Sequence, residues 1–180
     1  MIFTADRTIL VLIDVQEKLA PLMHERDACV GAMSQLLKGA TALRVPVIWM
    51  EQLPEKMGET IPELREVLAG LTPIAKGAFS CCGEPAFRDA LRTSGCTHVL
   101  LAGIESHVCV YQTAADLLTD GFKVKVIADA VSSRTAANRQ AGLDAARAAG
   151  AGIATVEMIL FELMRDSAHP AFRDILKIVK

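Results

Sequence analysis

Six short runs of mostly apolar residues recur along the chain, separated by longer segments of mixed polarity. The runs are rich in Val, Ile and Leu and are apolar almost throughout, instead of alternating with polar residues. This pattern is typical of strands that are buried on both faces of a sheet. We therefore predict strands over residues 8–14, 45–51, 72–76, 97–103, 122–129 and 151–157.

The segments between these runs have apolar residues at helical spacing. Over residues 30–43 the apolar positions recur three or four residues apart, which predicts a helix between the first two strands. Further helices, each ending in a glycine, are predicted over residues 84–95, 106–121 and 138–150. Strands and helices that alternate in this way predict an α/β fold, in which helices cover both faces of a mostly parallel sheet.

Length and charge limit the possible classes of protein. The 180 residues fit one domain, predicted to span residues 1–180. A net charge of −2, with basic residues scattered along the chain, argues against a nucleic-acid partner. No apolar run is long enough to cross a bilayer and no secretion signal is present, so we expect a cytoplasmic protein with no membrane partner.

The apolar fraction and the cysteines add two expectations. Apolar residues make up 52% of the chain although aromatic residues make up only 4%, a high apolar content for a small monomer. We therefore expect subunits to cover part of this surface in a homo-oligomer. The five cysteines are odd in number and lack CxxC spacing, which predicts free thiols.

Polar residues follow several of the predicted strands. In a parallel sheet, ligands bind beyond the carboxyl ends of the strands, near the point where strand order reverses. The residues in this position are Asp14, Glu51, Lys76, the segment 103–109 and Asp129.

Three of these residues have chemistry that suits catalysis, and each also has a simpler explanation. Asp14 is either a cap or turn residue or a general base. Lys76 is either a solvated surface residue or a cation held beside a carboxylate and a thiol. Cys109 is either core packing or a nucleophile, placed in the first turn of a helix that begins near Ser106, where unpaired backbone N–H groups favour an anion.

Other patterns in the sequence are less informative. The four histidines are far apart and form no ligand pair, so no metal site is predicted. The glycines match neither a dinucleotide nor a P-loop motif. Cys81 and Cys82 are adjacent, which we interpret as packing or as the rim of a site. The segment 51–60 is either a lid or a plain connection.

Five segments together resemble a known family, the isochorismatase-like cysteine hydrolases, which include nicotinamidases and N-carbamoylsarcosine amidohydrolase. The segments are LVLIDVQ with Asp14, AKGAFS with Lys76, LAGIESHVCVYQTAADL with Cys109, ADAVSSR at 128–134, and TVEMILFELM at 155–164. Their order matches the family over nearly the full chain.

The resemblance implies a fold and a catalytic site. It implies a three-layer, Rossmann-like fold with six strands in the order 3-2-1-4-5-6, and a triad of Asp14, Lys76 and Cys109. It also implies a cis peptide between Ile104 and Glu105, and an oxyanion hole formed by the backbone N–H groups of Glu105 and Cys109.

Two departures from the family narrow the implied activity. Nicotinamidases carry a metal site with paired histidines after the second strand, and here residues 50–60 contain no histidine. True isochorismatases lack the cysteine, so Cys109 argues against vinyl ether hydrolysis. We expect a cofactor-free hydrolase of a small amide or related C–N substrate, with pocket residues Gln16, Glu51, Gln52, Phe79 and Ser80.

Two alternatives stay open on the sequence. The first is a scaffold or redox sensor that uses Cys109, Cys81 or Cys82 as an oxidisable thiol. The second is hydrolysis of an ester or a nitrile. Retention of both Asp14 and Lys76 favours hydrolysis, because a sensor needs no proton donor for a leaving group.

Overall fold

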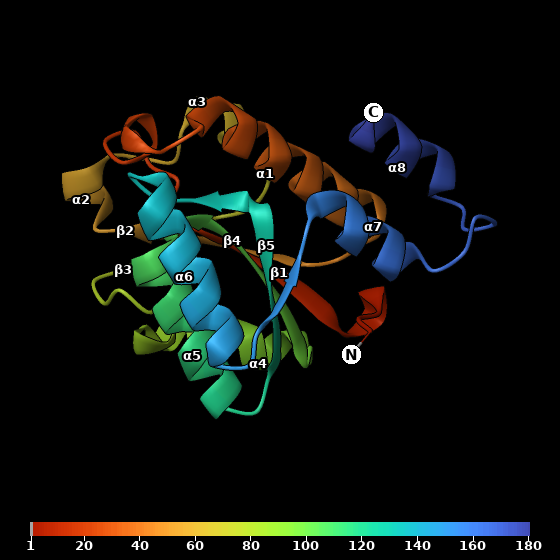
Figure 1. Ribbon diagram of the computed structural model, residues 1–180. Coiled ribbons are helices and arrows are strands. Elements are labelled where there is room, and N and C mark those ends of the chain that lie inside the picture. The colour runs from red at the N-terminus through yellow and green to blue at the C-terminus, as the bar shows by residue number, and fades with distance from the viewer. Residues whose placement is uncertain (1) are drawn as a thin grey trace.

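Six strands form one sheet at the centre of the molecule (Figure 1). In the computed structural model, which describes residues 2–180, every strand pairing is parallel. The strand order is β3-β2-β1-β4-β5-β6, which confirms the implied order and the α/β fold class. The strands are β1 (Thr8–Ile13), β2 (Val47–Gln52), β3 (Ile74–Lys76), β4 (His98–Ile104), β5 (Lys123–Ser132) and β6 (Gly152–Ala154).

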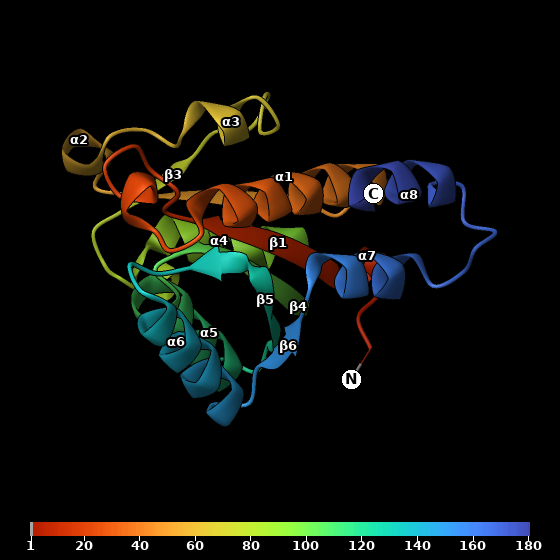
Figure 2. The same cartoon turned by 45° about the horizontal axis from the view of Figure 1, so that its top comes forward.

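Helices cover both faces of this sheet, as the apolar runs predicted (Figures 1 and 2). In β1, Leu10 and Leu12 pack into one core while Ile9, Val11 and Ile13 pack into the other. The first core lies under α1 (Arg26–Ala42), α3 (Pro62–Arg65), α7 (Val156–Met164) and α8 (Phe172–Val179). The second core lies under α4 (Pro85–Ser94), α5 (Tyr111–Thr119) and α6 (Ala136–Ala148).

The last predicted strand is too long at its C-terminal end. The sequence predicted a strand over 151–157, but β6 ends at Ala154 and α7 begins at Val156. The side chain of Thr155 accepts a hydrogen bond from the Met158 N–H, and the Asp129 carboxylate accepts one from the Val156 N–H. These caps satisfy N–H groups that a helix start leaves unpaired, so helix replaces strand at this point.

The predicted helix over 106–121 also differs from the structure. A π-helical turn spans Ser106–Val110, and the regular helix α5 begins only at Tyr111. Cys109 therefore lies in the π turn, just before the α-helix. π turns are rare and are frequent at functional sites.

The direction of the connections reverses between β1 and β4. From β1 the chain continues to β2 and β3 on one side, and from β4 it continues to β5 and β6 on the other. Ligands bind beyond the carboxyl ends of the strands at such a reversal of order. Asp14 directly follows β1, and the segment that leads to Cys109 follows β4.

Gly103 allows β1 and β4 to come together at this end of the sheet. Its φ is +124°, and a Cβ atom at this position would lie 2.1 Å from the Ile13 carbonyl oxygen. Only glycine adopts this conformation and leaves this space free.

Candidate active site

Asp14 is the first residue after β1, and its backbone turns sharply there. Its φ is 57°, in the left-handed region that Asp tolerates better than most residues. The Asp14 N–H donates to the Met50 carbonyl at 3.1 Å, and the Asp14 carbonyl accepts from the Gln16 N–H at 2.8 Å. Asp14 is only 1% exposed, so the carboxylate is held inside the protein.

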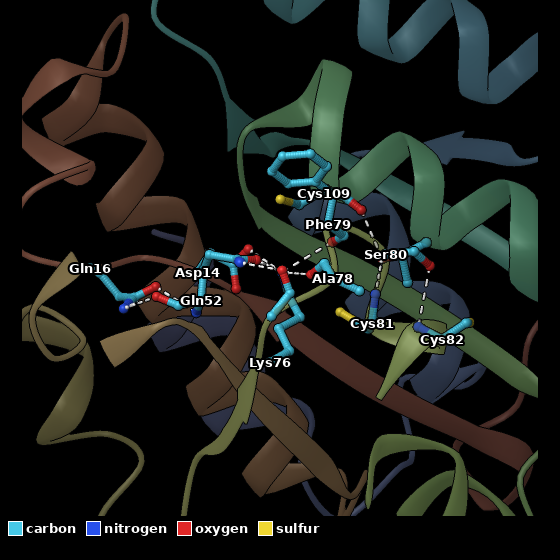
Figure 3. A network of polar contacts seen from close by, with 12 residues as sticks. Asp14, Gln16, Gln52, Lys76, Ala78, Phe79, Ser80, Cys81, Cys82 and Cys109 are labelled. Carbon is cyan, nitrogen blue, oxygen red and sulfur yellow. Dashed lines mark hydrogen bonds and ion pairs between the residues drawn. The ribbon is translucent and has the colours of Figure 1, made fainter. Parts of the chain in front are cut away.

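Lys76 ends β3 and points inward toward Asp14 (Figure 3). Its Nζ atom lies 2.7 Å from Asp14 Oδ2 and 2.6 Å from Gln52 Oε1. The carbonyl oxygens of Phe79 and Ala78 lie 3.0 and 3.2 Å from Nζ. Lys76 is 2% exposed, which excludes a solvated surface lysine. Because an ammonium has three N–H groups, these acceptors satisfy it fully.

Cys109 is held by contacts on both sides of the π turn. The Thr113 hydroxyl donates to the Cys109 carbonyl at 2.7 Å and accepts from the Cys81 N–H at 3.0 Å. On the other side, Gly142 of α6 packs against the turn, and a Cβ atom there would lie 2.5 Å from the Ser106 carbonyl carbon. The side chain of Cys109 is buried. Both neighbours therefore fix where the thiol lies.

The peptide bond between Ile104 and Glu105, at the end of β4, is cis. The Glu105 carbonyl accepts hydrogen bonds from the Val108 N–H at 3.1 Å and the Val110 N–H at 3.3 Å. These bonds close the turn that carries Cys109. The Glu105 side chain pairs with Arg134, with Arg134 Nε 2.7 Å from Glu105 Oε1.

Asp14 and Cys109 line the same pocket, which has a volume of about 200 Å³. Its other polar lining residues are Gln52 and Glu105. The rest of the wall is apolar and consists of Leu19, Leu53, Met57, Phe79, Ile104 and Val108. Lys76 does not line the pocket and lies behind Asp14.

Burial controls the protonation of the two reactive groups. Burial raises the pKa of Asp14 above its usual value, although the ion pair with Lys76 opposes this shift. Burial raises the pKa of the Cys109 thiol, and the nearby Asp14 carboxylate raises it further. Cys109 therefore rests as a neutral thiol and needs a base to become a nucleophile.

Asp14 presents one free oxygen that can serve as this base. Oδ2 is bound to Lys76, whereas Oδ1 is buried with no hydrogen-bond partner among residues 2–180. A buried carboxylate oxygen without a partner is uncommon, since the lost hydrogen bond costs stability. The thiol of Cys109 is close enough for each group to shift the pKa of the other.

The pH dependence of thiol alkylation tests this assignment. A raised pKa leaves less thiolate at neutral pH than a free cysteine has, so iodoacetamide should react slowly with Cys109 near pH 8 and faster as the pH increases further. We expect a rate constant about tenfold or more below that of N-acetylcysteine amide near pH 8. Peptide mapping by mass spectrometry over about pH 6 to 10 measures it. A Cys109 rate above that of the reference thiol at neutral pH would contradict the raised pKa.

Two of the five predicted pocket residues line the pocket, Gln52 and Phe79. The prediction is corrected for Gln16, Glu51 and Ser80, whose polar atoms bind other parts of the protein. Glu51 Oε1 accepts from both the N–H and the hydroxyl of Thr60, each at 2.7 Å. The Ser80 hydroxyl donates to Asp116 at 2.6 Å.

Gln16 holds the segment 51–60 in place. Its Nε2 donates to the Gly58 carbonyl at 2.7 Å and the Gln52 carbonyl at 3.0 Å, and its Oε1 accepts from the Gln52 N–H at 2.8 Å. The Glu17 N–H donates to the Glu59 carbonyl at 3.0 Å. Of the two sequence interpretations, lid or connection, these bonds favour a fixed connection that forms one wall of the pocket.

Sequence reasoning missed most of the apolar wall. Leu53 precedes the short helix α2 (Pro54–Met57), and Met57 ends it. Leu19 shortly follows the motif that carries Asp14, and Val108 lies within the motif that carries Cys109. Proximity to the motifs was the only available signal, because an apolar residue in a loop is not distinguishable from core in the sequence.

The histidines, acids and cysteines form no metal centre in residues 2–180: no group of three or more of these side chains is placed to hold an ion. All five cysteines are free and buried. No helix in the same residues has the length and apolar content needed to cross a bilayer.

The fold and the site together define a three-layer α/β protein with a thiol and a carboxylate in one pocket at the reversal of strand order. The family model described as isochorismatase domain matches residues 8–158. The chain therefore belongs to the isochorismatase family of hydrolases.

Similar proteins agree with this assignment. The chain is 40% identical over 176 residues to isochorismatase domain-containing protein 2A of Mus musculus, covering 97% of this chain and 84% of the relative. The solved structure called MAR1 ribonuclease from Caenorhabditis elegans is 37% identical, with a TM-score of 0.93, covering 99% of this chain and 92% of the other. The YcaC product of Escherichia coli, described as an octameric hydrolase of unknown specificity, shares the fold at 24% identity and a TM-score of 0.89, covering 98% of this chain and 95% of the other.

Proposed function

We propose that this protein is a cysteine hydrolase that cleaves a small amide or a related C–N bond, with Cys109 as nucleophile, Asp14 as general base and acid, and Lys76 as the group that positions Asp14. One observation carries the proposal: Asp14 and Cys109 line one pocket, and the Asp14 oxygen that is not bound to Lys76 has no hydrogen-bond partner within residues 2–180.

The first half of the reaction transfers the acyl group to the thiol. Asp14 takes the proton of Cys109 as the sulfur attacks the carbonyl carbon, which forms a C–S bond and a tetrahedral oxyanion. The backbone N–H groups of Glu105 and Cys109 hold this oxyanion. The oxyanion then reforms the carbonyl, the C–N bond breaks, and Asp14 returns the proton to the departing amine or ammonia.

The second half releases the acid. A thioester joins the acyl group to Cys109, and Asp14 removes a proton from water as the water oxygen attacks the thioester carbon. The C–S bond breaks and the proton on Asp14 returns to the sulfur. Throughout, Lys76 keeps Asp14 Oδ2 fixed so that Oδ1 stays free to take and return protons. These steps need no cofactor, because the side chains supply both the nucleophile and the proton transfer.

The electrostatics favour this function over a redox sensor. Sensor cysteines have a low pKa and are accessible to solvent. Here burial and Asp14 raise the pKa of Cys109, and burial raises the pKa of Cys81 to about 12 and that of Cys82 to about 11. A base beside the thiol suits acyl transfer, in which the thiolate forms only as substrate is attacked.

The pocket also argues against RNA as substrate, although one relative is called a ribonuclease. Proteins that bind RNA or DNA neutralise phosphates with Lys and Arg side chains. The lining residues of this pocket include neither, and the chain has a net charge of −2.

The proposal extends to assembly and location. Large apolar side chains are exposed at Ile2, Leu22, Leu71, Phe79 and Met158. Such side chains suit subunit contacts, and the E. coli fold neighbour is octameric. A homo-oligomer in the cytoplasm is the state in which we expect the enzyme to act.

Mass spectrometry of the acylated enzyme tests the function. The protein is incubated with a panel of small amides, ureido acids, esters and nitriles, and the release of ammonia or amine is followed in parallel. We expect an acyl mass shift on the peptide that contains Cys109, together with turnover. Cys109→Ala should lose both, whereas Cys96→Ala, a buried thiol at the other end of β4, should keep both. An adduct on another cysteine, or turnover by Cys109→Ala, would overturn the assignment.

A further inference from the structure

No positively charged side chain of the described residues, 2–180, lines the pocket. None of its lining residues is Lys, Arg or His. The nearest ammonium, Lys76, already donates to Asp14, Gln52 and Phe79, so it has no N–H left for a ligand. Arg134 does not line the pocket, and its Nε atom pairs with Oε1 of the lining residue Glu105 at 2.7 Å.

The charged groups that do line the pocket are both acids, Asp14 and Glu105. Asp14 is compensated by Lys76, and Glu105 by Arg134. When Cys109 passes its proton to Asp14, the negative charge moves from the carboxylate to the sulfur and stays inside the pocket. A ligand carboxylate would have to leave water, would meet no cation, and would be repelled by the reacting sulfur, so its charge carries a penalty that a neutral ligand avoids.

The walls favour a short apolar group. Leu53 and Met57 come from the segment around α2, Phe79 from the segment after β3, and Val108 from the π turn. A volume of about 200 Å³ has room for a ligand of fewer than about ten non-hydrogen atoms. Phe79 is 57% exposed and contributes its ring at the rim.

We infer that the pocket selects uncharged ligands and that the substrate is a neutral amide whose acyl group is short and apolar; the second part rests on the proposed function. Amides that carry a carboxylate, such as ureido acids and dicarboxylic acid monoamides, are excluded by charge, although they would fit by size. Selectivity for neutral substrates thus comes from the lack of any free cation in the pocket.

A pair of alkylating agents tests the charge selectivity without any turnover. Iodoacetamide and iodoacetate have nearly the same shape but differ in charge. The rate ratio of the two reagents at Cys109, read by peptide mapping, is divided by the same ratio for the neutral thiol N-acetylcysteine amide. We expect a preference for iodoacetamide about tenfold or more beyond that of the reference thiol. A ratio equal to the reference, or in favour of iodoacetate, would overturn the inference.

Variants at Met57 show whether the missing cation is the cause. Met57 lines the pocket, and the loop is held through its backbone: its carbonyl accepts from the Lys18 N–H at 3.2 Å and its N–H donates to the Leu53 carbonyl at 2.9 Å. Met57→Lys should bring the reagent ratio down by about threefold or more, and Met57→Leu should leave it unchanged. Phe79→Lys, at an exposed position, is the second variant if Met57→Lys does not fold. An unchanged ratio in a folded lysine variant would contradict the inference.

Turnover of butyramide and succinamate, which differ by a terminal carboxylate, extends the test to substrates. We expect wild type to prefer butyramide and Met57→Lys to reduce this preference. If neither amide nor any panel member gives an adduct while the reagent ratio still favours iodoacetamide, the proposed function fails and the charge selectivity stands. If both amides react equally well and the reagent ratio equals the reference, the inference fails and the hydrolase stands.

Discussion

Asp14→Asn should lower kcat/KM by about a thousandfold for any amide that acylates Cys109. The asparagine side chain keeps the shape of the aspartate but cannot take the thiol proton, and the same group acts in acylation, in amine release and in attack by water. Because Cys109 rests protonated, the loss of its base affects every turnover. Steady-state kinetics with the best substrate from the mass-spectrometric panel measures the effect.

Alkylation provides the control for this variant. Asp14 raises the pKa of Cys109, so removing its charge should increase the reaction of Cys109 with iodoacetamide near pH 8 while turnover falls. A faster alkylation together with a slower turnover distinguishes a proton shuttle from a carboxylate that has only a structural role. If Asp14→Asn slows alkylation as much as turnover, the shuttle role is refuted.

Lys76→Met should lower the free energy of unfolding by about 3–5 kcal/mol, because it leaves a buried carboxylate without its partner. The Lys76–Asp14 distance is 2.7 Å and both side chains are almost inaccessible to solvent, so water cannot replace the ammonium. Urea unfolding followed by circular dichroism measures the loss. Lys56→Met, at an exposed position in α2, is the matched control and should change stability by less than about 0.5 kcal/mol.

The double variant Asp14→Asn, Lys76→Met identifies the origin of this cost. Once residue 14 is neutral, removal of the ammonium no longer leaves a buried charge without a partner. The two losses of stability should therefore not add. We expect the double variant to be more stable than the sum of the single effects predicts. Additive effects would show that Lys76 stabilises the protein through Gln52 and the 78–79 carbonyls instead of through Asp14.

The positions of the catalytic candidates followed from the sequence because they depend on strand ends. Parallel strands place their carboxyl ends on one edge of the sheet, so an acid after β1, a lysine at the end of β3 and a thiol after β4 converge regardless of the details of the loops. The apolar runs identified those ends within a few residues. The same logic failed for Gln16 and Glu51, because proximity to a strand end does not say which way a side chain points.

Hydrogen bonds between different segments of the chain account for these errors and for the misplaced end of the last strand. Glu51 points toward Thr60, and Gln16 points toward the 52–58 backbone. Nothing in the sequence indicates that these segments lie against each other. The strand predicted over 151–157 ended early because Asp129, from a different strand, caps α7. A cap supplied from about 27 residues away is a tertiary effect, which local propensity does not contain.

Gly103 makes the spacing between Asp14, the proposed base, and Cys109, the proposed nucleophile, a property of the backbone. The strand ends that precede Asp14 and Cys109 are in contact there, with the Ile13 carbonyl in the space that a side chain would fill. Part of the apolar wall, in contrast, belongs to the connection that carries Leu53 and Met57, which does not set that spacing. Side chains in this connection can therefore change the shape of the pocket while the distance between the two strand ends stays the same.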